Sequence, residues 1–135
     1  MKIEVKGKMS TFGGPHDMGV KPDEGLALVS EHNEHHFAEY FLPTQPPGTT
    51  GLARRLNPEK YYIACRWDYT QTPAHSLRHI MVKVTNPANG RSAYAKPVDW
   101  GPHEQKSHGR VADLSPGLAR FLGLQTDQNV EVKYN

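Results

Sequence analysis

Hydrophobic and polar residues alternate at both ends of the chain and in parts of its second half. Residues 1–12 (MKIEVKGKMSTF) and 129–134 (NVEVKY) place apolar side chains at every second position over much of their length. This period of two is typical of a strand with one buried face. Two further strands are predicted, at residues 25–30 (GLALVS), a short apolar run between turn residues, and at residues 61–67 (YYIACRW), which are β-branched and aromatic.

A hairpin is predicted between residues 79 and 100. The run HIMVKVTN alternates around Met81, Val82 and Val84, and the run RSAYAKPVDW follows it. The residues Pro-Ala-Asn-Gly between these runs contain the Asn-Gly pair that favours a tight turn between antiparallel strands.

Helical signals occur in two segments. In the run EHNEHHFAEYFL, the aromatic residues Phe37, Tyr40 and Phe41 have the spacing i, i+3, i+4, which predicts one or two helical turns. The run DLSPGLARFLG predicts a second helix, which begins at a Ser-Pro pair suited to the cap and the first helical position and ends at a glycine. Ser115 is the expected cap, Pro116 the first helical residue and Gly123 the terminating residue. The expected buried face consists of Leu118, Phe121 and Leu122.

Together these elements predict a mainly β protein with a single domain over residues 1–135. Residues 12–25 (FGGPHDMGVKPDEG) are expected to form a glycine-rich loop, and residues 31–60 an insertion of loop and helix that decorates a barrel or lies as a lid beside its groove. Many short strands avoid exposed edges by closing, so we expect a six-stranded barrel. Eleven prolines and twelve glycines agree with frequent turns.

Composition excludes several classes of protein. The net charge is only +2 and no run of five Lys or Arg occurs, so the basic footprint of a nucleic-acid binder is missing. No apolar stretch approaches the roughly 20 residues of a membrane span. Cys65 is alone, which excludes an internal disulfide and zinc sites that need several thiolates. The first ten residues do not look like a signal peptide, so the protein begins in the cytoplasm or an export signal has been removed.

Three ordered blocks in the second half carry a resemblance to a known family. They are VKVTNPANGR at residues 82–91, DWGP at residues 99–102 and GRVADLS at residues 109–115. Together with the opening STFGG they resemble the rare-lipoprotein-A and expansin-like double-psi β-barrel family. The resemblance implies a double-psi barrel, with a short helix after the DLS block, that binds or cleaves cell-wall polysaccharide.

The same resemblance nominates two catalytic residues, Asp99 of the DWGP block and Asp113 of the DLS block. A lytic transglycosylase needs a carboxyl group that protonates the glycosidic oxygen while the 6-hydroxyl of the sugar attacks the anomeric carbon. Asp99 is the candidate general acid. The alternative is that it stabilises its own turn through hydrogen bonds to the backbone. Asp113 can instead orient the entry of the helix. The family's usual arginine is replaced by Trp100, and the run IACRWD lacks the family's histidine.

Six further residues are candidates for substrate binding. Polar groups of the glycine-rich region can bind sugar hydroxyls or can serve ordinary turns. Aromatic rings can stack on sugar rings or can pack in the core. The candidates are Thr11, Asp17 and Glu24 among the polar residues, and Trp67, Tyr69 and Trp100 among the aromatic ones.

No metal site or cofactor is expected. His32 and His36 have the i, i+4 spacing that can hold a divalent ion on a helix, but a solvated polar face is the preferred interpretation. Cys65 lies in an apolar run and is interpreted as a small buried residue.

The sequence therefore predicts a protein that binds cell-wall glycan, with peptidoglycan as its polysaccharide ligand, and that carries out lytic transglycosylase-type cleavage or binding alone. An expansin-like binding module and a structural or assembly scaffold remain as alternatives, because barrels host unrelated functions. The expected location is the cell envelope or the extracellular space if an export signal was removed. The sequence does not define the oligomeric state.

Overall fold

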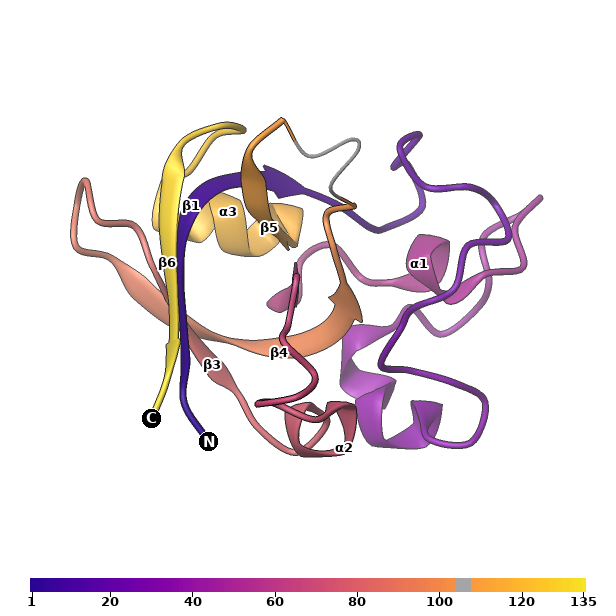
Figure 1. Ribbon diagram of the computed structural model, residues 1–135. Coiled ribbons are helices and arrows are strands. Elements are labelled where there is room, and N and C mark those ends of the chain that lie inside the picture. The colour runs from indigo at the N-terminus through magenta and orange to yellow at the C-terminus, as the bar shows by residue number, and fades with distance from the viewer. Residues whose placement is uncertain (104–107) are drawn as a thin grey trace.

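The computed structural model describes residues 1–103 and 108–135 (Figure 1). Its strands are β1 (Ile3–Thr11), β2 (Tyr62–Cys65), β3 (Val82–Thr85), β4 (Ser92–Trp100), β5 (Arg110–Leu114) and β6 (Asn129–Tyr134). Its helices are the 3₁₀ helix η1 (Glu34–Tyr40) and the α-helices α1 (Leu52–Arg55), α2 (Ala74–Leu77) and α3 (Pro116–Leu122). Over the described ranges, none of these helices has the length and apolar character needed to cross a bilayer.

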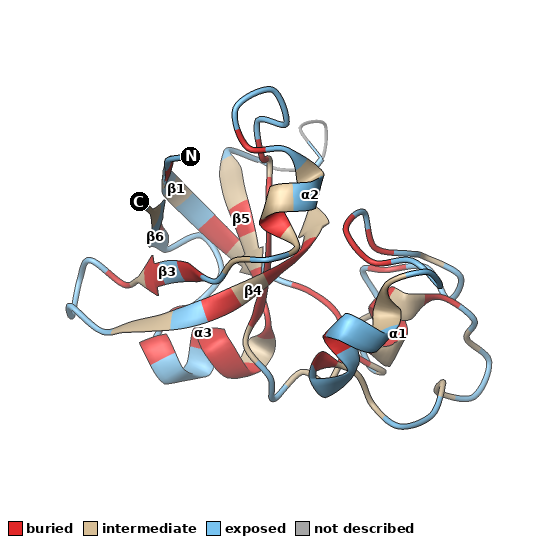
Figure 2. Ribbon diagram, turned by 90° about the horizontal axis from the view of Figure 1, so that it is seen from below, coloured by how far each residue is buried: buried red, intermediate tan, exposed pale blue. Residues whose placement is uncertain are grey.

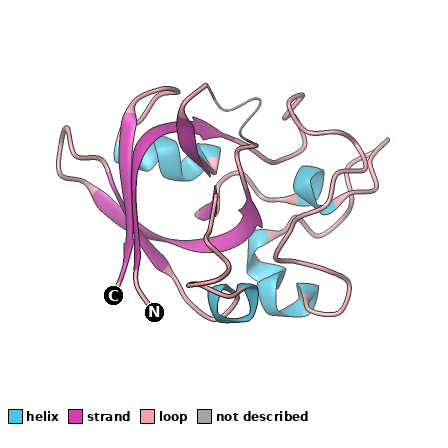
Figure 3. Cartoon of the chain, in the orientation of Figure 1, coloured by secondary structure: helices cyan, strands magenta, loops and turns pink. Residues whose placement is uncertain are grey.

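The strands close into a barrel in the order β1–β5–β2–β4–β3–β6 (Figure 3). Two neighbouring pairs, β1 with β5 and β2 with β4, run parallel, and the other pairs run antiparallel. The mainly β class and the six-stranded closed barrel expected from the sequence are confirmed. Closure satisfies the backbone groups that an open sheet would leave at its edges.

One of the six strands differs from the prediction. Residues 25–30 form a turn with an isolated bridge between Leu26 and Val29, so the predicted strand is wrong. Leu26, Leu28 and Val29 are all buried, and a strand would direct neighbouring side chains to opposite faces. In its place the barrel contains β5, in a segment for which no strand was predicted.

Two apolar clusters stabilise the molecule (Figure 2). The barrel cluster fills the inside of the barrel and includes Ile63, Cys65 and Leu114. The outer cluster lies where residues 12–57 meet the outside of the barrel, and it includes Phe37 and Ala64. Because neighbouring residues of β2 point into different clusters, this strand separates the two cores.

The segment of residues 31–60 lies beside the barrel and contains no strand (Figure 1). Its predicted helical turns are confirmed as η1, which buries Phe37 and Tyr40. Lys96 of β4 extends over the Phe37 ring at 5.3 Å and donates hydrogen bonds to the carbonyls of Arg78 and Ile80. The insertion is thus attached to the barrel wall by packing and by a half-buried cation.

Helix α3 begins and ends as its sequence predicts. The Ser115 hydroxyl accepts the Leu118 N–H at 3.2 Å, and Gly123 takes the left-handed conformation at a φ of 71°. Leu118 and Leu122 are buried as expected. Phe121 is 45% exposed, so its assignment to the buried face is wrong. Its position in the last turn places it under the Arg91 guanidinium, on the outside of the molecule.

Candidate functional site

Strand β2 brings the two predicted catalytic aspartates to one face of the barrel. Ala64 pairs with Asp99 of β4 on one side and with Asp113 of β5 on the other. Directly paired residues direct their side chains to the same face of a sheet. Two strand spacings separate the aspartates, which corresponds to Cα atoms about 10 Å apart. Both side chains are partly exposed at the face where the outer cluster lies.

An irregularity in β4 places Asp99 on this face. The register between β2 and β4 shifts between Ile63 and Ala64, so that Val98 is skipped and Asp99 pairs with Ala64. Val98 belongs to the outer cluster, and strict alternation would send its neighbour into the barrel. A bulge changes the direction of the next side chain, which puts Asp99 on the outer face together with Val98.

The Asp99 carboxyl is held by the turn that replaced the predicted strand. Its Oδ1 accepts the Ala27 N–H at 2.8 Å, and the neighbouring backbone is fixed because the Asp99 carbonyl accepts the Trp67 indole N–H at 2.9 Å. Burial raises the pKa of Asp99 to about 6, although the hydrogen bonds to backbone N–H groups and the charge of His103 oppose this change. The charge of Glu24 adds to the increase.

Asp113 has the more strongly perturbed carboxyl of the two. Burial raises its pKa to about 7, and the negative charges of Asp99 and Asp17 contribute in the same direction. The positive charges of Arg110 and Arg66 oppose the increase. Within the described ranges, no hydrogen bond restrains this carboxyl, whereas that of Asp99 is held by Ala27.

Asp17 connects the glycine-rich loop to this carboxyl pair. Its two oxygens accept the N–H groups of Gly13 at 2.7 Å and Gly19 at 2.8 Å, so the side chain organises the loop as well as adding charge. A hollow of about 320 Å³ lies against this loop, and Thr11 and Asp17 are among its lining residues. Asp99 and Asp113 do not line it, and Asp17 is the residue that the hollow and the carboxyl cluster share.

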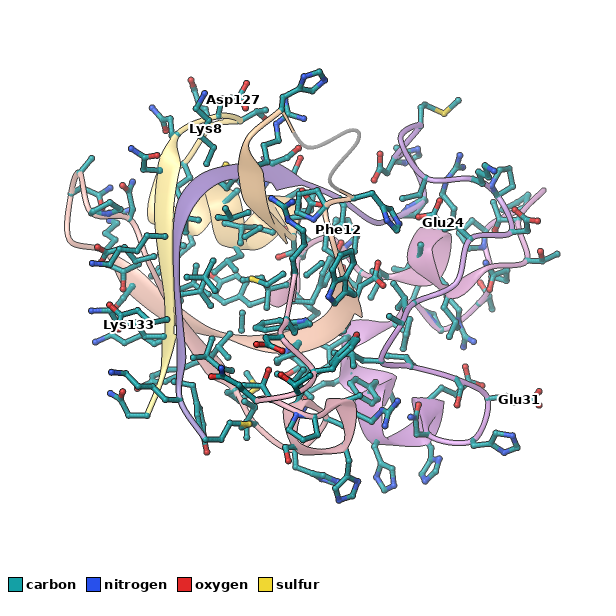
Figure 4. All side chains as sticks on the ribbon, in the orientation of Figure 1. Lys8, Phe12, Glu24, Glu31, Asp127 and Lys133 are labelled. Atoms are coloured by element: carbon teal, nitrogen blue, oxygen red, sulfur yellow. The ribbon has the colours of Figure 1, made fainter. Side chains whose placement is uncertain are left out.

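Glu24 is partly exposed and lies on the same side of the molecule as Phe12 (Figure 4). Its charge acts on Asp99, so the residue lies near this carboxyl. Gly51 packs directly against the backbone of residues 23 and 24, where a Cβ atom would have no room. Glycine at position 51 therefore allows the two segments of backbone to approach each other at Glu24.

The three aromatic candidates have different environments. Trp67 is 4% exposed and packs in the barrel cluster, which is the core position considered for it beside sugar stacking. Trp100 is half-buried, and its indole N–H donates to the Trp67 carbonyl at 3.0 Å. Tyr69 is 41% exposed, and the charge of Asp99 contributes to the increase in its pKa after burial itself. The charge of Asp99 thus reaches Tyr69, whereas Trp100 pairs with Cys65 and packs against the barrel cluster.

Sequence reasoning missed several residues of this site. Ala27 contributes a backbone N–H and Ala64 contributes spacing, and neither role has a signal in the side chain itself. Arg110 could have been found, because it belongs to the GRVADLS block that nominated Asp113. It forms an ion pair of 2.8 Å with Asp127 while its charge acts on Asp113.

The histidine-rich segment begins at the surface of the molecule. His32 is highly exposed and approaches Glu31, which points outward from the molecule (Figure 4). Across residues 1–103 and 108–135, no group of three or more His, Cys, Asp or Glu side chains has the geometry to hold a metal ion. Cys65 is fully buried, as expected, and burial raises the pKa of its thiol.

Comparison with known proteins gives one partial relative. The chain is 39% identical over 77 residues to the probable endolytic peptidoglycan transglycosylase RlpA of Nostoc sp.. The match covers 56% of this chain and only 17% of the length of that protein. No protein-family model matches the chain. This relative and the closed barrel confirm the resemblance to the rare-lipoprotein-A family that the sequence blocks indicated.

Proposed function

We propose, on the premise that this domain is similar to a rare-lipoprotein-A transglycosylase, that it binds peptidoglycan glycan strands and cleaves them by a lytic transglycosylase reaction. The observation that carries the proposal is the position of Asp99 and Asp113 on either side of Ala64, with the pKa of both carboxyls raised. A peptidoglycan substrate puts the site of action in the cell envelope.

The perturbed pKa values suit acid catalysis at neutral pH. A general acid must be protonated at the working pH, and a carboxyl of ordinary pKa is ionised there. Asp113, with a pKa of about 7, holds its proton longer than Asp99, with a pKa of about 6. Between these values the pair holds one proton, which is the arrangement that separates an acid from its ionised partner.

In the proposed reaction the Asp113 carboxyl donates its proton to the glycosidic oxygen, and the bond from that oxygen to the anomeric carbon breaks. The ionised Asp99 stabilises the positive charge that develops at the anomeric carbon. The 6-hydroxyl of the same sugar attacks this carbon and forms the 1,6-anhydro ring. Its proton returns to the Asp113 carboxylate, which restores the starting state. The sequence blocks had nominated Asp99 for the acid, and its hydrogen bond with Ala27 is the reason to assign it the ionised role.

Glycan binding without turnover is the second candidate function. It is favoured by the same Ala27 hydrogen bond, because a carboxylate held by the backbone also serves as a fixed acceptor for sugar hydroxyls. Tyr69, whose pKa is raised in part by the charge of Asp99, would then act as a stacking surface beside it. An expansin-like module would use these contacts alone.

The test is digestion of purified sacculi, followed by mass spectrometry of the soluble products. Wild-type protein is expected to release muropeptides that end in a 1,6-anhydro sugar, and Asp113→Asn is expected to release at least about 100-fold less. Glu131→Gln, on β6, is the matched control and should retain full activity. If the protein sediments with sacculi but releases no anhydro product, the binding module is supported. If it shows no binding and releases no product, both functions are excluded.

A further inference from the structure

The hollow beside the carboxyl cluster lies near the residue that follows Asp113, the proposed acid. Thr11 at the end of β1 pairs with Leu114, which directly follows Asp113, and Pro116 begins helix α3. Thr11 and Pro116 both line the hollow, and Asp17 lines it from the glycine-rich loop. The hollow therefore lies next to the end of β5 that carries Asp113, and Asp17 connects it to that carboxyl.

The walls of this hollow are mostly carbon. Three prolines contribute their rings, Phe12 contributes the edge of a buried ring, and the backbone of two glycines adds no side chain. Both glycines have positive φ, and a Cβ atom on Gly13 would lie 2.5 Å from the Tyr62 hydroxyl oxygen. The prolines are Pro15, Pro58 and Pro116.

The charged groups that line the hollow are already engaged. The two oxygens of Asp17 accept backbone N–H groups, and Glu59 forms an ion pair of 2.7 Å with Arg120. A cationic amine in the hollow would therefore meet carboxylates that already have hydrogen-bond or ion-pair partners. The exposed Thr11 hydroxyl stands at the edge and can exchange a hydrogen bond with a neutral polar group.

We propose that this hollow takes the N-acetyl group of an amino sugar bound at Asp99 and Asp113. An acetamido group has a methyl that suits the proline rings and a neutral amide that suits the Thr11 hydroxyl. The volume of about 320 Å³ is more than an acetamido group needs, so it also leaves room for the edge of the sugar ring that carries this group. This inference rests on the proposed glycan binding and adds the substituent that the site selects.

The probe is a set of soluble glycan strands from peptidoglycan, freed of peptides, N-deacetylated and then re-acylated with either acetyl or formyl groups. Both products carry neutral amides and differ by one methyl per sugar. Burial of one methyl predicts that acetyl strands bind about four-fold more tightly than formyl strands. Binding is measured by calorimetry with the wild-type domain.

Variants locate the origin of this preference. Pro15→Ala combined with Pro58→Ala removes ring carbons from the hollow and should lower the acetyl-to-formyl ratio from about four towards one. Pro87→Ala is the matched control, because Pro87 occupies an exposed turn between β3 and β4 and should leave the ratio unchanged. Circular dichroism confirms that each variant is folded. The comparison of acetyl and formyl strands with the wild-type domain does not depend on the folding of any variant.

Each result decides the proposal. A wild-type ratio of about four that is lost in the double variant and kept in Pro87→Ala supports it. Equal binding of acetyl and formyl strands overturns the N-acetyl pocket and leaves the proposed glycan binding intact. A ratio that survives in the folded double variant also overturns the pocket, because the acetyl group is then recognised elsewhere. Failure to bind either strand rejects the proposed function and this inference with it.

Discussion

At the scale of single residues, Asp113 lies where the fold opposes its ionisation. Burial and the charges of Asp99 and Asp17 all raise the pKa of this carboxyl, and only the arginines oppose them. A position that makes a carboxyl a good proton donor at neutral pH also makes its anion unfavourable in the folded state. The proposed role of Asp113 as a proton donor therefore conflicts with the stability of the fold.

We predict that Asp113→Asn stabilises the domain at pH 8 by about 4 kcal/mol relative to wild type. The folded-state pKa of about 7 lies above the value of 3.8 for an exposed aspartate. Wild type consequently loses stability as the pH rises from about 4 through about 7, whereas an amide does not titrate. Urea unfolding at pH 4 and pH 8 measures the effect. Equal stability of the two proteins at pH 8 would contradict the raised pKa.

The sequence identifies Asp99 and Asp113, because both belong to blocks with recognisable spacing. It does not identify Ala27, whose contribution is a backbone N–H 72 positions away from Asp99. The bulge that aims Asp99 outward is equally invisible, since it arises from the pairing of β4 with β2. Contacts set by the pairing of distant strands carry no local signal.

At the scale of elements, the turn between β3 and β4 clamps the end of helix α3. The side-chain amides of Asn86 and Asn89 both donate to the Leu122 carbonyl, at 2.8 and 3.0 Å. Arg91 donates to the Phe121 carbonyl at 2.9 Å. Carbonyls at the end of a helix lack partners within it, so this turn satisfies them. The TNPANGR part of the resemblance thus has a structural role in this chain.

We predict that Asn86→Ala lowers the free energy of unfolding by about 2 kcal/mol, because a buried carbonyl loses one of its two donors. Thermal unfolding by calorimetry measures the loss. Asn135→Ala, at the exposed C-terminus, is the control and should leave the stability unchanged. An Asn86 variant as stable as wild type would show that Asn89 and Arg91 suffice to hold the helix.

Elements with local signals were predictable and those without were not. Helix α3 has a capping serine, a first-turn proline and a terminating glycine, so its bounds follow from the sequence. Strand β5 is only five residues long and is defined by its partners β1 and β2. Residues 25–30 have apolar composition for another reason, because from a turn Leu26 and Val29 pack in the outer cluster and Leu28 packs in the barrel cluster.

At the scale of the whole molecule, the two apolar clusters lie on opposite faces of strand β2. The barrel cluster is enclosed by the six strands, while the outer cluster depends on residues 12–57 remaining docked (Figure 2). The Ala27 N–H that holds Asp99 and the Glu24 charge that acts on it both come from the docked segment. The site therefore needs the second core even though its aspartates belong to the barrel.

We predict that Phe37→Ala releases the docked segment while the barrel stays folded. Loss of this buried ring costs about 3 kcal/mol of packing in the outer cluster. Hydrogen exchange followed by mass spectrometry should show faster exchange in residues 24–57 and unchanged protection in β1, β3 and β6. Glycan binding should fall with it. Uniform loss of protection over both clusters would show that the two cores unfold as one unit.

The two ends of the chain lie side by side, because Ile3 at the start of β1 pairs with Tyr134 at the end of β6 (Figure 1). A few glycines could link them without disturbing the barrel, and the chain could then be reopened in the exposed loop at Pro47 and Gly48. Such a circular permutant would keep every strand pair while reversing the order in which its halves are synthesised. It would also allow the domain to be immobilised from a different point on its surface.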